Sequence, residues 1–205
     1  MDSTAKAPAF FPHTREQAEA RAWALPSPGR VGMFSLIAAE SAIFVIFIVA
    51  YAFYVGKSLS GPTPSVLHPP LFISVCLLSS SATMELAVRS LKRRKSSAFT
   101  SWWLLTIALG AIFLVGTGLE WRHLIVDEGL TISSNLFGTT FYSLVGLHGF
   151  HVTVGLLLMT TVAVFAGLKK VTAEHASKVE LIALYWHFVD SVWVAVFTLV
   201  YVLGR

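Results

Sequence analysis

Five long apolar stretches, separated by clusters of charged residues, constrain this chain more than any other feature. Each is at least as long as the roughly 20 residues that a helix needs to cross the hydrocarbon core of a bilayer. With 55% hydrophobic and 13% charged residues, the composition is too apolar for a water-soluble domain of 205 residues. The sequence therefore predicts an all-α, polytopic membrane bundle with five transmembrane helices, at about residues 31–56, 69–90, 98–121, 137–168 and 180–203.

The same composition excludes several other classes of protein. A disordered chain needs low hydrophobicity, and a disulfide scaffold needs more cysteines than Cys76 alone. The net charge of +4 comes from short basic clusters between the apolar stretches, which does not resemble a nucleic-acid-binding face. We therefore expect no nucleic acid as a partner.

The basic clusters predict the topology, because cytoplasmic loops of membrane proteins are enriched in Lys and Arg. Twelve of the 15 basic residues lie in the tail 1–30 or in the loops that follow the second and fourth stretches. The other side has Lys57, Arg122 and Arg205. We expect a cytoplasmic N-terminal tail (1–30), a transmembrane domain (31–205) and an external C-terminus.

Ionisable residues inside these stretches are candidate functional groups, because each is costly at bilayer depth. Glu40 lies about ten residues into the first stretch, roughly 15 Å from its cytoplasmic end, without a basic residue within one turn. It serves either as a structural hydrogen-bonding group or in proton handling. Glu85 is spaced for an interfacial ion pair with Arg89. Glu120 falls in an outer interfacial belt of aromatic and charged residues.

The last two stretches carry a further polar set. His148 and His151 share one face of the fourth helix, and glycines flank that face. The fifth stretch carries Glu180, His187 and Asp190. The two pairs could form a polar bridge between the helices or, as an alternative, ligate a metal. The bridge explains the residues more economically, and we expect neither a metal site nor a catalytic nucleophile in this chain.

Two segments closely resemble signature helices of a known family. Residues 137–155 (FGTTFYSLVGLHGFHVTVG) and 185–193 (YWHFVDSVW) are similar to helices of subunit III of the haem-copper terminal oxidases. Residues 33–41 (MFSLIAAES) resemble the carboxylate-bearing helix of that family, and residues 131–134 (TISS) add support. The resemblance covers about residues 32–203, and with five spans the chain looks like the short bacterial form.

The resemblance implies a multi-pass subunit of a bacterial inner-membrane oxidase that reduces oxygen and pumps protons. It implies no cofactor in this chain, haem and copper in the partner subunits I and II, a small subunit IV as a further candidate partner, and bound phospholipid. Glu40, Glu120, His148, His151, Glu180, His187 and Asp190 correspond to buried polar positions of the family, with structural and proton-related roles. The subunit would stabilise the catalytic subunit and support its proton uptake.

Several alternatives stay open at this stage. Residues 131–141 and 185–187 look like the cytochrome c branch of the family, whereas residues 123–126 and 200–204 look like the quinol branch. We favour cytochrome c as the electron donor, with a ubiquinol or menaquinol oxidase as the alternative. A stand-alone proton-coupled carrier and a membrane metalloenzyme are more remote hypotheses, and the absence of a visible inverted repeat disfavours the carrier.

Overall fold

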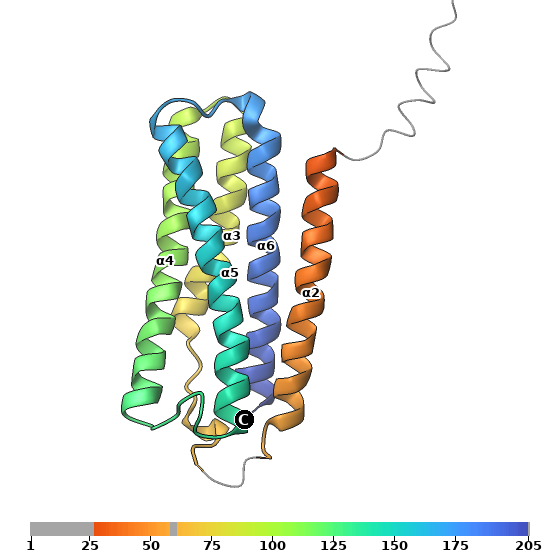
Figure 1. Cartoon of the computed structure of the whole chain (residues 1–205). Coiled ribbons are helices and arrows are strands. Elements are labelled where there is room, and N and C mark those ends of the chain that lie inside the picture. The colour runs from red at the N-terminus through yellow and green to blue at the C-terminus, as the bar shows by residue number, and fades with distance from the viewer. Residues whose placement is uncertain (1–26, 58–60, 205) are drawn as a thin grey trace, which may run out of the picture.

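The protein forms an elongated bundle of five long helices (Figure 1). The computed structural model describes residues 27–57 and 61–204, and these residues contain helices and connections but no strand. The long helices are α2 (Pro28–Tyr54), α3 (Leu71–Lys92), α4 (Ser96–Val126), α5 (Leu136–Gly167) and α6 (Ala176–Phe197). All five are long and apolar enough to cross a membrane, which confirms the predicted architecture.

The helix ends follow from local chemistry. α2 begins at Pro28, where the fixed φ of proline suits the first helical turn, so residues 28–30 of the expected tail are helical. Residues 1–26 lie outside the described residues. α5 begins at Leu136 because the side chain of Asn135 accepts a hydrogen bond from the Gly138 N–H at 2.8 Å. α4 extends to Val126, beyond the expected end near residue 121. Its last turn is closed by a hydrogen bond from the Asp127 N–H to the His123 carbonyl oxygen.

Short connections join neighbouring helices. α3 and α4 form a hairpin through residues 93–95, and α5 and α6 are joined by a loop with the 3₁₀ turn η2 (Ala173–His175). We call the end of the bundle with these two loops the basic end. The connection from α2 to α3 contains the 3₁₀ turn η1 (Pro64–Val66), and α6 continues into the π-helical segment η3 (Thr198–Leu203).

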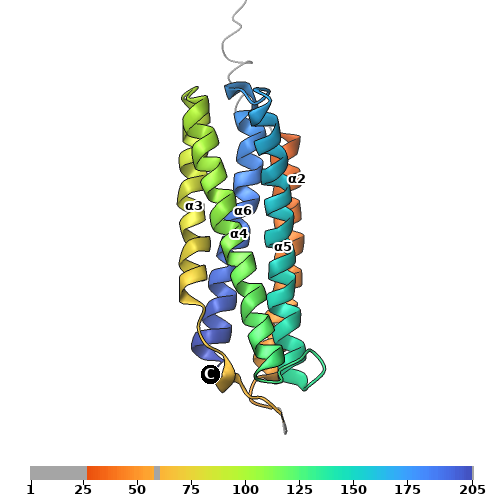
Figure 2. The same cartoon turned by 90° about the vertical axis from the view of Figure 1, so that its left-hand side faces the viewer.

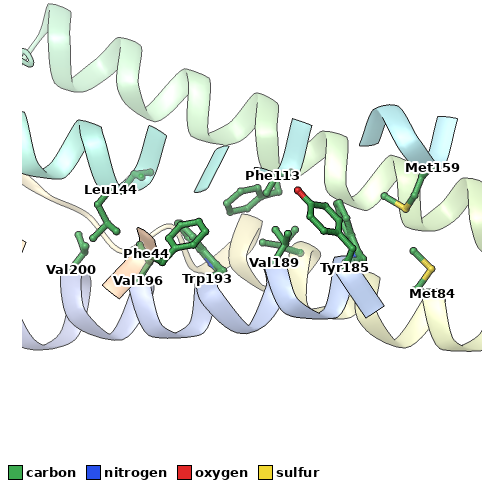
Figure 3. Close-up of a cluster of buried hydrophobic side chains, with 14 of the residues drawn as sticks. Phe44, Met84, Phe113, Leu144, Met159, Tyr185, Val189, Trp193, Val196 and Val200 are labelled. Carbon is green, nitrogen blue, oxygen red and sulfur yellow. The ribbon is translucent and has the colours of Figure 1, made fainter. Parts of the chain in front are cut away.

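α6 occupies the centre of the bundle. It packs against α3 on one side and α5 on another, and α2 packs on α5 and α6 (Figures 1 and 2). Its buried side chains meet residues of α4 and α5, such as Phe113 and Leu144, in a continuous apolar core (Figure 3). Trp103, Trp186 and Trp193 are fully buried there.

The outer surface of the bundle is apolar. Large side chains such as Phe34, Ile46, Phe72 and Val115 are more than half exposed, which suits helices whose surroundings are lipid or another membrane subunit. α2 is the extreme case, because only Phe44 and Tyr51 are buried along its length.

Candidate functional site: paired polar groups between the helices

Glu40 of α2 and His151 of α5 form a polar pair across the interface of these helices. The Glu40 Oε2 atom lies 3.0 Å from His151 Nε2, and the His151 side chain is only 6% exposed. Phe44, one turn along α2, packs against the same imidazole, with ring centroids 4.9 Å apart. The carboxyl group that lacked a local partner in the sequence is therefore satisfied by a helix more than 100 residues away.

The second ring nitrogen determines how this pair holds a proton. His151 Nδ1 lies 2.8 Å from the Leu147 carbonyl oxygen, and a carbonyl can only accept, so Nδ1 carries a hydrogen. The contact between Nε2 and Glu40 then needs one shared proton. Its two forms are carboxylic acid with neutral imidazole and carboxylate with imidazolium, and both have zero net charge. The pair can exchange the position of a proton without placing a net charge in the membrane.

A second polar cluster lies between α3 and α6. The Ser81 hydroxyl lies 3.0 Å from His187 Nδ1 and donates a hydrogen bond to Asp190 Oδ2. His187 and Asp190 are three residues apart on α6, so one hydroxyl on α3 reaches both. This serine joins the two α6 residues to α3, whereas the sequence predicted a bridge to α5.

Two buried tryptophans of α6 strengthen the same interface. The indole N–H of Trp186 donates to the Ser80 hydroxyl at 2.8 Å, and that of Trp193 donates to the Ser74 hydroxyl at 3.1 Å.

The indole of Trp186 also fills the space left by two glycines, because a Cβ at Gly155 would lie 2.7 Å from its ring, and one at Gly110 would lie 2.9 Å from it. The glycine of α5 therefore accommodates an aromatic ring rather than a neighbouring backbone.

His148 is fully buried in an aromatic setting. Its ring stacks on Trp193 at 4.9 Å and meets the edge of Phe113 at 5.7 Å. Neither ring nitrogen has a hydrogen-bond partner among the residues that the structure describes. The two histidines of the signature thus have different environments, because His151 faces α2 and His148 faces the core between α4 and α6.

The remaining predicted residues lie near the two ends of the bundle. At the basic end, Glu180 forms ion pairs with Lys92 of α3 and, at 3.3 Å, with Arg30 of α2, so it joins three helices. Glu85 pairs with Arg89 at 2.7 Å, with the spacing that the sequence indicates.

At the opposite end, Glu120 of α4 accepts a hydrogen bond from the Tyr201 hydroxyl of η3 at 3.0 Å. Tyr201 could not be identified as this partner from the sequence, because only the packing of η3 against α4 brings the two groups together.

The proposed metal ligands do not assemble. His151 is paired with Glu40, whereas His187 and Asp190 share Ser81 on α3. Within residues 27–57 and 61–204, no group of three or more His, Cys, Asp or Glu side chains has the proximity to hold a metal ion. Hydroxyl groups, which were not among the predicted site residues, instead complete the polar contacts between the helices. They come from Ser74, Ser80, Ser81 and Tyr201.

A groove with a volume of about 360 Å³ lies between α5 and α6 near the basic end. Its walls are apolar, with Val162 and Phe165 from α5 and Ile182 from α6. Lys170 and Lys178 line it as well, and none of its lining residues within the described ranges carries a carboxylate. An apolar groove with basic groups near the helix ends has the chemistry of a lipid site.

The fold and these contacts define a class: a multi-pass helical membrane protein whose ionisable side chains lie at the contacts between its helices. A family model described as "Cytochrome c oxidase subunit III" matches residues 24–205. The chain belongs to this family of haem-copper oxidase subunits, and its complex contains other oxidase subunits.

Relatives that are named cytochrome c oxidase subunit 3, or probably so, cover most of the chain. A cytochrome c oxidase subunit 3 from Synechocystis is 39% identical over 84% of this chain and 74% of its own length. One from Alkalihalophilus pseudofirmus is 34% identical over 85% and 86%, respectively. A probable cytochrome c oxidase subunit 3 from Mycobacterium tuberculosis is 31% identical over 88% and 92%.

Proposed function

We propose that this chain is a non-catalytic subunit of a proton-pumping cytochrome c oxidase in a bacterial inner membrane. It stabilises the catalytic subunit I and supports proton uptake, and subunit II and a small subunit IV complete the complex. Haem and copper belong to the partner subunits. The N-terminus is cytoplasmic and the C-terminus external, since the basic end carries most of the Lys and Arg residues of the loops.

The observation that carries the proposal is the Glu40–His151 pair. Both side chains are used in a contact between two helices of this chain, with the proton between them, so they are suited to stabilising the bundle and to holding a proton. The cluster of Ser81, His187 and Asp190 is likewise closed by hydrogen bonds within the chain. Such groups favour a structural and proton-related role over redox chemistry at this subunit.

The identity of the relatives supports cytochrome c as the electron donor. Their printed names specify cytochrome c oxidases, and each relative covers more than four fifths of this chain. This weighs against the ubiquinol or menaquinol alternative.

The groove between α5 and α6 supports phospholipid binding. An acyl chain fits between Phe165 and Ile182, and a phosphate group fits beside Lys170 and Lys178. The largely exposed apolar surface of α2 supports a packing partner or lipid in the assembled complex.

Purification tests the proposal directly. A tagged chain extracted in mild detergent is expected to copurify with a haem-containing subunit that oxidises reduced cytochrome c. Oxidase depleted of this chain is expected to keep its haem spectrum but to lose activity sooner during sustained turnover. A chain that purifies without haem, or an oxidase that sustains turnover equally well without it, would overturn the proposal.

A further inference from the structure

A second hollow at the basic end is separate from the lipid groove. It lies between the ends of α3, α4 and α5 and has a volume of about 440 Å³. Its apolar residues include Leu91, Phe99 and Ala166, and the first two are almost completely buried. The loop between α5 and α6 lies between the two spaces: Lys169 lines this hollow, Lys170 lines the groove, and Val171 lines both.

Three charged side chains line the hollow: Arg94, Lys169 and Glu174. All three are exposed, and none forms an ion pair or side-chain hydrogen bond with any residue in the described ranges. Lys92 and Arg30 at this end pair with Glu180 instead. Among the described residues, the hollow therefore presents two unpaired cations and one unpaired carboxylate above an apolar floor.

The backbone fixes the points from which the two basic side chains extend. Arg94 and Lys169 each follow the end of a helix in the left-handed region, with φ of 57° and 58°, where glycine is usual. The next residues close the helix ends, since Lys95 N–H donates to the Ser90 carbonyl oxygen at 3.0 Å and Lys170 N–H to that of Phe165 at 2.9 Å. Both helices thus end in the same motif with a basic residue at the position that glycine normally takes.

We propose that this hollow binds the headgroup of a zwitterionic aminophospholipid, with ethanolamine as the amine. The phosphate lies between Arg94 and Lys169, the ammonium group meets Glu174, and the first part of an acyl chain lies along Phe99. The helix ends place the hollow at headgroup depth. An anionic glycerol headgroup leaves Glu174 facing negative charge, and a choline headgroup has no N–H to donate to it.

The occupant is a membrane lipid rather than a soluble phosphate ester, because the floor of the hollow is apolar and continuous with the bundle core. The inference requires that the basic end meets a membrane surface and does not depend on the electron donor.

Native mass spectrometry of the assembled, delipidated complex provides the first test. Phosphatidylethanolamine, phosphatidylglycerol and phosphatidylcholine are added back separately to wild type, to an Arg94→Gln/Lys169→Gln variant and to Glu174→Gln. The double variant is expected to bind phosphatidylethanolamine about tenfold more weakly at one site. Glu174→Gln is expected to shift that site from ethanolamine towards glycerol headgroups. Lys95→Gln is the matched control, because Lys95 is an exposed basic residue next to Arg94 that lines neither this hollow nor the lipid groove, and the ethanolamine site should be unchanged.

Several results would overturn the proposal. They are equal phosphatidylethanolamine binding by the wild type and the double variant, the same loss in Lys95→Gln, and unchanged headgroup preference in Glu174→Gln. Displacement of the bound lipid by glycerophosphoethanolamine, which has the same charges but no acyl chains, would indicate a soluble ligand instead.

A second measurement uses the wild-type complex and so does not depend on variant assembly. Phosphatidylethanolamine with a photoreactive diazirine beside its headgroup is expected to label peptides that contain residues 94–100 and 171–174. Labelling confined to the peptides of the α5–α6 groove, or absent from both segments, would contradict the assignment.

Discussion

The contacts of α2 and those between α3 and α6 represent two ways to hold a helix in a membrane bundle. α2 has two buried residues and is attached at mid-membrane through the Glu40–His151 pair. The α3–α6 interface has serines along its length, and they bond to two tryptophans and to the pair of His187 and Asp190. Apolar helices gain little from leaving lipid for one another, so directional bonds and close packing decide which contacts are firm. We expect α3–α6 to determine stability and the α2 contact to be more important for function.

The strongest test of the α3–α6 contact is Gly155→Ala, because Gly155 of α5 packs against Trp186, whose indole N–H bonds to Ser80 of α3. The added methyl group would lie 2.7 Å from the Trp186 ring, which is fully buried and has no room to move, so we expect a loss of about 3 kcal/mol in bundle stability. Unfolding of the purified subunit in mixed detergent micelles measures it. Gly149→Ala on the same helix is the control, because nothing lies within 4 Å of its Cβ position and alanine favours the helix. Equal stability of the two variants would remove the distinction between the regions.

A smaller loss is expected for Ser81→Ala. The change leaves His187 Nδ1 and Asp190 Oδ2 without their shared partner, at a cost of about 1 to 2 kcal/mol in a membrane interface. The same unfolding assay applies, together with the yield of assembled complex. Ser90→Ala provides the control, since among the described residues that hydroxyl bonds only to the Leu86 carbonyl oxygen of its own helix. A Ser81→Ala variant as stable as this control would mean that the cluster does not hold α3 to α6.

Glu40→Gln tests the functional side of the comparison. An amide N–H can still donate to His151 Nε2, but it cannot share a proton with it, so stability should change by about 1 kcal/mol or less. The number of turnovers before the assembled oxidase loses activity is expected to fall. Glu85→Gln, at an exposed pair with Arg89, should leave that number unchanged. An unchanged number of turnovers before inactivation in Glu40→Gln would show that the pair is only structural.

The smallest effect is expected for Arg30→Gln. Its guanidinium pairs with Glu180 at 3.3 Å, but the side chain is 58% exposed and Glu180 keeps Lys92, so the loss should stay below about 0.5 kcal/mol. The unfolding assay at low and high salt checks this, because screening should abolish the difference. A larger, salt-independent loss would mean that α2 is held more firmly at the basic end than its burial indicates.

Much of the candidate site was predictable from the residue types alone, because an ionisable group in an apolar stretch must find a partner. Glu85 with Arg89 is a local pair, fixed by helix geometry. The partner of Glu40 was not predictable, since it lies on another helix and depends on how α2 and α5 are rotated. Ser81 gave no signal either, because a serine in an apolar helix usually bonds to its own backbone, as Ser90 does.

The sequence by itself determined five membrane-spanning helices, their approximate limits and which side chains need a polar partner inside the membrane. These properties depend on the length and polarity of continuous segments, which the chain displays directly. Only the tertiary structure decided that His151 joins Glu40, that His187 and Asp190 share a hydroxyl of α3, and that His148 is enclosed by aromatic rings. These contacts depend on the rotation and order of helices around the bundle, and apolar faces that also suit lipid leave that choice to side-chain packing.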